Sequence, residues 1–272
     1  MEKRPLLICT DPGIDDFIAL SMLLARPEFD VLGMIALSGN VGLDVTLNNA
    51  LLAAELNGRP DIPVLSGSAK PLARPARTAS NIHGKSGLGK SAELYAKRRP
   101  TPGDGADFII EAAKKYPGRL EILSLGPLID VALALQKAPE IAQSIACITV
   151  MGGGIHAGNA TKYAEFNIVA DPEAASVVFS SGAKTVMIGL DATNCCLQPR
   201  SDIELLRAPG TLGRVIPAML SDYADVYKSV HNLDGMIIHD AICAVYLWRP
   251  ELFTCLPCRM QVCLEDGEHL GQ

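Results

Sequence analysis

The sequence is poor in aromatic and basic residues and contains no long apolar run. Aromatic residues make up 5% of its 272 positions, and 24 lysines and arginines stand against 30 aspartates and glutamates, for a formal net charge of −6. This balance argues against a general nucleic-acid binder, which normally presents a basic face. Apolar stretches such as Phe17–Ala25 are too short to span a membrane, so we expect no membrane contact.

The chain also lacks an apolar signal core after its first residues, so we expect a cytoplasmic protein. Its eight cysteines lie mostly in apolar segments, and we interpret them as buried thiols and not as a disulfide framework. Cys255 and Cys258 have redox or zinc spacing. However, the possible ligands after them are irregularly spaced and Cys263 lies in a strand-like run, so we do not expect a zinc site.

Strand-like and helix-like runs alternate through the first two thirds of the chain. This alternation predicts an α/β fold with a mostly parallel central sheet and helices on both faces. The expected strands are Leu6–Thr10, Val31–Leu37, Pro63–Leu65, Leu120–Leu125, Ala146–Met151 and Thr185–Leu190. The expected helices are Asp15–Ala25, Val45–Leu56, Ala106–Lys115, Leu128–Gln136 and Glu173–Ser180.

Two further segments complete the expected domain, which we take as a single unit over residues 1–272. Ser66–Gly103 is rich in proline and glycine and lacks periodicity, so we expect a long loop region of the kind that covers an active site. After Asp191 the chain is mostly helical up to about Trp248, and we expect a helical cap beside the sheet.

Polar residues and glycines follow the expected strands. In open α/β sheets, ligands bind beyond the carboxyl ends of the strands, so these positions are expected to form the site. They are Asp11, Asn40, Gly126, Gly152 and Asp191.

The densest of these features is the carboxylate group Asp11, Asp15 and Asp16 at a strand end and helix start. Crowded carboxylates repel one another unless a proton or a cation lies between them, and oxygen ligands suit calcium or magnesium. Capping of the helix explains one or two of the three carboxylates, but not all of them. We therefore expect a metal site here.

Three weaker features each have an ordinary structural alternative. Glu165 and Asn167 would point the same way on an extended segment and could bind paired sugar hydroxyls, or they belong to a polar loop. His239 and Asp240 open an apolar helix, where Asp240 could simply be the N-cap. Tyr223, Tyr227 and His231 have helical spacing and either face a ligand or pack within the protein.

Together these pieces resemble the inosine-uridine nucleoside hydrolase family, and bacterial members that accept both purine and pyrimidine ribonucleosides look most similar. The resemblance covers nearly the whole chain. It rests on Asp11-Pro-Gly-Ile-Asp-Asp16, Gly39-Asn-Val41, His83-Gly-Lys-Ser-Gly-Leu-Gly89, Gly126-Pro-Leu128, Val150-Met-Gly-Gly153, Ala164-Glu-Phe-Asn167, Asp171-Pro-Glu-Ala-Ala175 and His239-Asp240.

The resemblance implies hydrolysis of the N-glycosidic bond of a ribonucleoside and a calcium cofactor. Calcium would be bound by Asp11, Asp16 and Asp240 with the backbone carbonyl of Leu125, and Asp11 would take a proton from the calcium-bound water. Such chemistry is consistent with the residues, because carboxylates favour the positive charge that develops on the sugar ring.

The resemblance also assigns the substrate contacts. The ribose hydroxyls would be bound by Asp15, Asn40, Glu165 and Asn167, and Met151 would line the sugar pocket. His239 would be the proton donor to the leaving base, since histidine can supply a proton near neutral pH. His83 would lie near the base in a mobile loop.

The sequence departs from the family in two places. The family usually has an aspartate where Cys9 stands, which could weaken the orientation of the site, and the chain is shorter at its C-terminus than its relatives. A catalytically impaired nucleoside-binding relative therefore stays open as an alternative. A metal-dependent phosphohydrolase is a second alternative, although Cys9 occupies the first position of the Asp-x-Asp pair which that chemistry uses. The family resemblance further implies a homo-oligomer, either a dimer or a tetramer.

Overall fold

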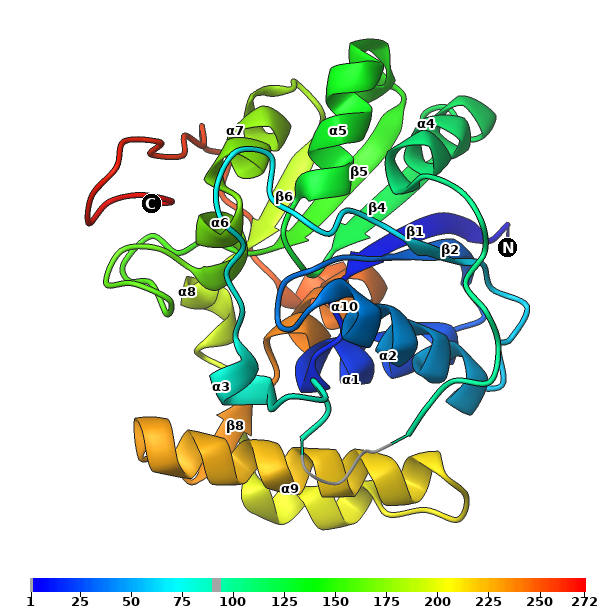
Figure 1. The fold of residues 1–272 in the computed structure, drawn as a ribbon, viewed down its shortest axis with the longest axis vertical. Helices are drawn as coiled ribbons and strands as arrows, with labels where there is room; N and C mark the ends of the chain where they lie inside the picture. The colour runs from blue at the N-terminus through cyan, green and yellow to red at the C-terminus, as the bar shows by residue number, and fades with distance from the viewer. Residues whose placement is uncertain (1, 90–93) are drawn as a thin grey trace.

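A six-stranded parallel sheet forms the centre of the computed structural model, which describes residues 2–89 and 94–272 (Figure 1). The strand order is β3-β2-β1-β4-β5-β6. The chain starts near the middle of the sheet, adds β2 and β3 on one side of β1, and then adds β4, β5 and β6 on the other side. The strands are β1 Arg4–Thr10, β2 Phe29–Ala36, β3 Val64–Ser66, β4 Leu120–Ser124, β5 Ile145–Met151 and β6 Thr185–Ile188. These bounds confirm the expected α/β fold.

Helices cover both faces of the sheet, as Figure 1 shows. On one face, α1 (Ile14–Leu24) packs against α2 (Leu43–Leu56) and α10 (His239–Trp248). On the other face, α5 (Ile129–Lys137) packs between α4 (Gly105–Lys115) and α7 (Pro172–Ser180). The short elements are α3 Ser80–His83, η1 Pro139–Gln143, α6 Phe166–Ala170, α8 Leu190–Thr193, η2 Arg200–Leu206 and η3 Pro250–Leu252.

The core has two layers because the central strands are buried on both sides. In β1, Leu6 and Ile8 contact the layer under α1, α2 and α10, whereas Leu7 and Cys9 contact the layer under α4, α5 and α7. A parallel strand between two helical layers needs such a continuous apolar run, and β1 has one up to the point where Thr10 and Asp11 begin the site.

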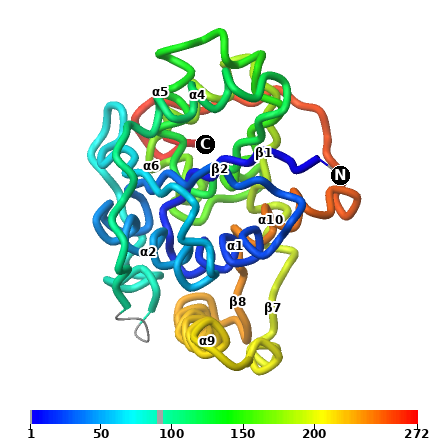
Figure 2. Tube along the Cα trace, turned by 90° about the vertical axis from the view of Figure 1, so that its right-hand side faces the viewer, coloured from blue at the N-terminus to red at the C-terminus, as the bar shows by residue number. Residues whose placement is uncertain are grey.

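The segments outside the sheet are partly more ordered than the sequence suggested. The expected loop region Ser66–Gly103 contains the helix α3, and residues 90–93 of it lie outside the described residues. The C-terminal part forms a two-stranded antiparallel sheet, β7 (Leu197–Pro199) with β8 (Gly235–Ile237), and the long helix α9 (Leu212–His231). Figure 2 shows α9 below α1 and α10, where it forms the expected helical cap.

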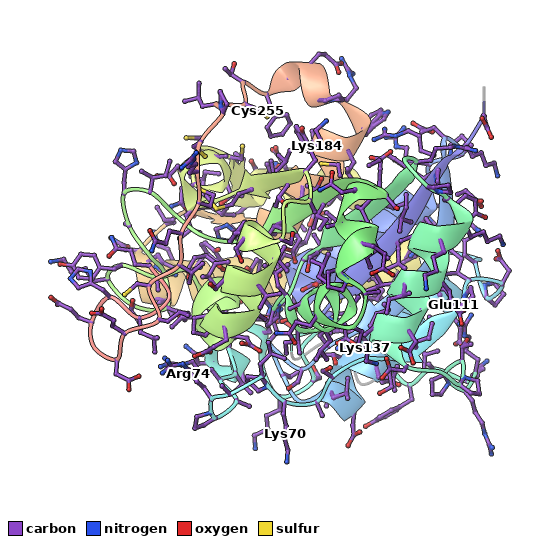
Figure 3. All side chains as sticks on the ribbon, turned by 90° about the horizontal axis from the view of Figure 1, so that it is seen from above. Lys70, Arg74, Glu111, Lys137, Lys184 and Cys255 are labelled. Atoms are coloured by element: carbon purple, nitrogen blue, oxygen red, sulfur yellow. The ribbon has the colours of Figure 1, made fainter. Side chains whose placement is uncertain are left out.

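The cysteines differ from the expectation of buried thiols. All eight are free, but only Cys9 and Cys243 are buried, while Cys195, Cys196 and two C-terminal cysteines are exposed. Figure 3 shows Cys255 at the periphery of the molecule, on the C-terminal segment. Cys263 also lies outside any strand, because the segment after η3 runs over the surface without sheet pairing.

Among the described residues, no helix combines the length and the apolarity that crossing a bilayer requires.

We predict that Leu6→Ala lowers the free energy of unfolding by about 2–5 kcal/mol, because it leaves a cavity in the central strand. Leu205→Ala is the matched control, since Leu205 is 81% exposed whereas Leu6 is fully buried, and its cost should stay below about 0.5 kcal/mol. Urea denaturation of both variants measures the difference. Equal midpoints for the two variants would show that β1 is not the core strand.

Candidate active site

A cavity of about 540 Å³ opens at the carboxyl edge of the sheet, bounded by α3 and α9. It brings together most of the residues expected to form the site. Those that line it are Asp15, Asn40, His83, Leu125, Met151, Glu165, Asn167, His239 and Asp240. Asp11 and Asp16 do not line the cavity, and both are fully buried. Of the strand-end residues, only Asn40 lines the cavity, while Asp11, Gly126, Gly152 and Asp191 do not. The Asp191 carboxylate accepts from the amides of Ile155 and His156 instead.

Asp16 is the centre of a local hydrogen-bond network that holds the β1–α1 turn. Its Oδ1 accepts from the Thr10 hydroxyl at 2.6 Å and from the Asp11 amide at 3.2 Å. Its Oδ2 accepts from the Gly13 amide at 3.0 Å and from Asn40 Nδ2 at 3.1 Å. The capping role considered for this turn is therefore real for Asp16, which lies at the third position of α1 and accepts from the N-cap amide.

The Asp11 carboxylate is tightly enclosed by the backbone around it. Its Oδ2 accepts the Asn40 amide at 2.6 Å, while its buried Oδ1 has no hydrogen-bond partner among the described residues. A Cβ added at Gly39 would lie 2.0 Å from Oδ2, and one added at Gly126 would lie 2.2 Å from Oδ1. Glycine is thus required at the ends of β2 and β4 because the carboxylate occupies the space of a side chain.

The aspartates fit a hard cation by their ligand atoms and by their electrostatics. One oxygen from each of Asp15, Asp16 and Asp240 lies within 4.8 Å of the others. Burial, followed by the charges of Asp16 and Asp15, raises the pKa of Asp240 well above its usual range. Burial and the charge of Asp16 likewise raise the pKa of Asp11. A cation would relieve this repulsion, and the oxygen-only ligand set excludes soft-metal sites built on thiolates.

The geometric group differs from the ligand set that the resemblance implies. It includes Asp15, whose buried Oδ1 has no hydrogen-bond partner among the described residues and lies 3.9 Å from His83 Nδ1. Burial raises the pKa of Asp15 to about 6. The geometric group leaves out Asp11, although the free Oδ1 of Asp11 is an available ligand. Both oxygens of Asp16 are already hydrogen-bonded.

Two asparagine amides are oriented by the backbone around them. Asn167 Nδ2 donates to the carbonyls of Leu125 at 2.6 Å and of Met151 at 3.0 Å. Asn40 Nδ2 donates to the Asp11 carbonyl at 3.2 Å as well as to Asp16. Since each NH₂ group is used, the side chains of Asn40 and Asn167 are left with their carbonyl oxygens as acceptors for sugar hydroxyls.

Glu165 and Asn167 both reach the cavity, but not from an extended segment as expected. Phe166–Ala170 forms the helix α6, and Glu165 is its N-cap, with Oε2 accepting from the amides of Ile168 and Gly153 at 3.2 and 3.1 Å. The helix forms because this carboxylate satisfies its free amides. Burial raises the pKa of Glu165 to about 7.

His239 starts α10 and forms the opposite wall of the cavity with α9. Its Nδ1 is 2.7 Å from Thr193 Oγ1, and its Nε2 is 3.1 Å from the Tyr227 hydroxyl. Burial lowers the pKa of His239 to about 4, so the ring is neutral at pH 7. Nothing in the local sequence predicts this burial. A neutral ring offers one N–H donor and carries no positive charge.

His83 is buried at the end of α3. It accepts a hydrogen bond from the Ile14 amide at its Nδ1, 3.2 Å away, and it stacks on Tyr223 with ring centroids 5.6 Å apart. Burial lowers its pKa to about 4. The tyrosines for which two interpretations were open do both: Tyr223 and Tyr227 line the cavity, and their rings also pack edge to face.

Four further polar side chains that no sequence pattern singled out line the cavity, from α3 with the segment before it and from the loop after β5. They are Arg77, Thr78, Asn81 and Asn159. A signal existed only for the first three, which belong to the segment expected to cover the site. Asn159 follows the glycines after β5, and nothing in its local pattern distinguishes it from a turn residue.

Known structures share this fold. A plant nucleoside hydrolase matches with a TM-score of 0.94 and 33% identity, over 98% of this chain and 85% of that one. A purine-preferring ribonucleoside hydrolase from Gardnerella vaginalis matches with a TM-score of 0.94 and 33% identity, over 99% of this chain and 87% of that one. The fold expected from the sequence is therefore confirmed.

Curated sequences agree with the structures. A pyrimidine-specific ribonucleoside hydrolase, RihA, from Salmonella schwarzengrund is 39% identical over 92% of this chain and 81% of its own length. Uridine nucleosidase 1 of Arabidopsis thaliana is 38% identical over 93% of this chain and 76% of its own. The profile of the family described as inosine-uridine preferring nucleoside hydrolase matches residues 6–272. The chain is thus an enzyme that belongs to the inosine-uridine preferring nucleoside hydrolase family.

Proposed function

We propose that this enzyme hydrolyses the N-glycosidic bond of purine and/or pyrimidine ribonucleosides to ribose and free base, with calcium as its cofactor. The observation that carries the proposal is the buried carboxylate cluster beneath one side of a nucleoside-sized cavity. Asp11 and Asp15 each have a buried oxygen in this region that has no hydrogen-bond partner among the described residues. Histidine and tyrosine side chains form the other side.

Asp11, Asp16 and Asp240, with the Leu125 carbonyl, would hold the cation, and Asp15 lies close enough to join them. When bound, calcium would neutralise the carboxylates and lower the pKa of a water molecule at the site. Asp11 is the base in this proposal, because its Oδ1 is buried and unpaired among the described residues while Asn40 fixes its Oδ2. A fixed carboxylate with one open oxygen can take a proton from the attacking water.

The sugar would be bound between the two asparagines. Asn40 and Asn167 offer carbonyl oxygens, and Asp15 and Glu165 offer carboxylates that accept from ribose hydroxyls. Met151 gives the apolar surface beneath the ring. The same carboxylates favour the positive charge that develops on the ribose as the bond breaks.

The base would leave toward the aromatic wall. His239, Tyr227 and His83 all line that side, and both histidines are neutral at pH 7. A neutral imidazole helps by donating a hydrogen bond from its N–H as negative charge grows on the base. The role of His239 in this proposal is therefore that of a neutral hydrogen-bond donor and not that of a protonated general acid.

Membership of the family and the absence of Asp at position 9 disfavour a phosphohydrolase. Cys9 is fully buried in the apolar layer under α5, where burial raises the pKa of its thiol, so it is a packed, neutral group. The cytoplasmic location and the dimeric or tetrameric assembly expected from the sequence remain part of the proposal.

We predict that purified enzyme with calcium releases reducing sugar from uridine or inosine, and that Asp11→Asn lowers kcat/KM by about 10²–10⁴-fold, because the base is lost. Asp44→Asn is the matched control, since Asp44 is exposed in the first turn of α2, and its activity should equal that of the wild type. A binding protein without turnover, or full turnover after metal removal verified by elemental analysis, would contradict the proposal.

We also predict that uridine is preferred over 2′-deoxyuridine by several orders of magnitude in kcat/KM. The loss of one hydroxyl leaves a buried acceptor of Asp15, Asn40 or Asn167 unpaired, and such sites reject analogues strongly. Steady-state kinetics on the two nucleosides measure the ratio. Comparable values would show that these side chains do not bind the ribose hydroxyls.

A further inference from the structure

Thr193 lies behind His239, on the side of that ring away from Tyr227, at the end of the four-residue helix α8 that follows β6. Its side chain is fully buried and does not line the cavity. Among the described residues, its hydroxyl has one hydrogen-bond partner, His239 Nδ1, at 2.7 Å. No sequence motif marks this residue, because the contact joins positions 46 apart in the chain.

The hydrogen bond between Tyr227 and Ile237 sets the direction of the hydrogen bonds around His239. The Tyr227 hydroxyl donates to the Ile237 carbonyl at 3.2 Å, and a carbonyl oxygen can only accept. The single proton of Tyr227 is therefore used there. The contact between Tyr227 and His239 Nε2 at 3.1 Å then requires the proton to be on Nε2.

The other ring nitrogen must consequently accept. Thr193 Oγ1 has no other hydrogen-bond partner among the described residues, so its proton is satisfied only when Nδ1 is the acceptor. The Thr193 hydroxyl has a proton to give and completes the series. In the opposite tautomer, with the proton on Nδ1, the Thr193 proton would have no acceptor among the described residues. The Tyr227 hydroxyl would then have to donate to Nε2 and lose its hydrogen bond to the Ile237 carbonyl.

We propose that Thr193 is a positioning residue that holds the His239 ring in the Nε2–H tautomer, with that N–H on the cavity side beside Tyr227. This inference rests on the proposed function, in which His239 assists the leaving base. Thr193 itself touches neither substrate nor metal. Its effect is to keep the one proton of the ring on Nε2, where a departing base can replace the Tyr227 hydroxyl as the acceptor of the hydrogen bond.

Thr193→Val tests this assignment because valine keeps the shape and removes the hydroxyl. We expect kcat for uridine and inosine to fall by about 10–100-fold with little change in KM, since a buried acceptor is left unsatisfied and the ring is no longer fixed. Turnover of p-nitrophenyl riboside should be unchanged, because its leaving group departs without a hydrogen bond. Thr193→Ser should restore the nucleoside rates to within a few-fold of wild type.

The matched control is Thr149→Val, since Thr149 is 1% exposed and its hydroxyl contacts Cys147, away from the residues that line the active-site cavity. This variant should behave as the wild type, and the calcium content of every variant is measured alongside. Equal losses on nucleosides and p-nitrophenyl riboside, or no restoration by Thr193→Ser, would reduce Thr193 to a packing residue and overturn the proposal.

Nitrogen-15 NMR of the His239 ring gives a readout that does not depend on turnover. Assigned by comparison with His239→Gln, the wild-type spectrum should show a protonated Nε2 and an unprotonated Nδ1, and Thr193→Val should shift both. A wild-type Nδ1–H tautomer would overturn the inference even if Thr193→Val does not fold. Inactive wild-type enzyme with the expected spectrum would instead refute the proposed function and leave the role of Thr193 in fixing the ring supported.

Discussion

The mutual repulsion of buried carboxylates at the end of β1 is the constraint around which the site is built. Asp11 follows the end of β1, while Asp15, Asp16 and Asp240 come from two helix starts that meet because α1 packs on α10. Burial raises the pKa of all four, so their negative charge is costly unless something positive shares the space. The protein tolerates this cost by hydrogen-bonding Asp16 fully and by clearing space around Asp11 with glycine.

The same arrangement couples the two halves of the proposed chemistry. His239 and Asp240 are adjacent at the start of α10, so the residue beside the leaving base and a residue of the metal cluster are positioned by one turn of helix. Thr193 and Tyr227 then fix the ring from α8 and α9. A shift in either contact therefore acts on the leaving-group side, while the β1–α1 turn keeps the metal side in place.

Local sequence was sufficient for the layers of the fold. The candidate site residues needed the family resemblance as well, and the structure gathers most of them around the cavity at the carboxyl edge of the sheet. The strand Ala146–Met151 and the helix Val45–Leu56 were expected within two residues of their observed bounds. Tertiary effects were beyond reach: the neutrality of His239 comes from burial by distant segments, and the orientation of Asn167 depends on two remote carbonyls. Helix α6 was missed because it has only five residues, and its N-cap Glu165 is the one sequence signal for it.

The central claim of the proposed function is that calcium binds the carboxylate cluster in place of protons. The melting temperature, measured with and without calcium as a function of pH, tests this claim most directly. Burial raises the pKa of Asp15 from 3.8 to about 6, so in metal-free protein its stabilising protonation is present below about pH 4 and is lost as the pH rises through about 6. Calcium should therefore raise the melting temperature little at pH 5 and much more at pH 8, and Asp240→Asn should abolish most of that difference. A calcium effect that is absent, or that is equal at both pH values, would contradict the account.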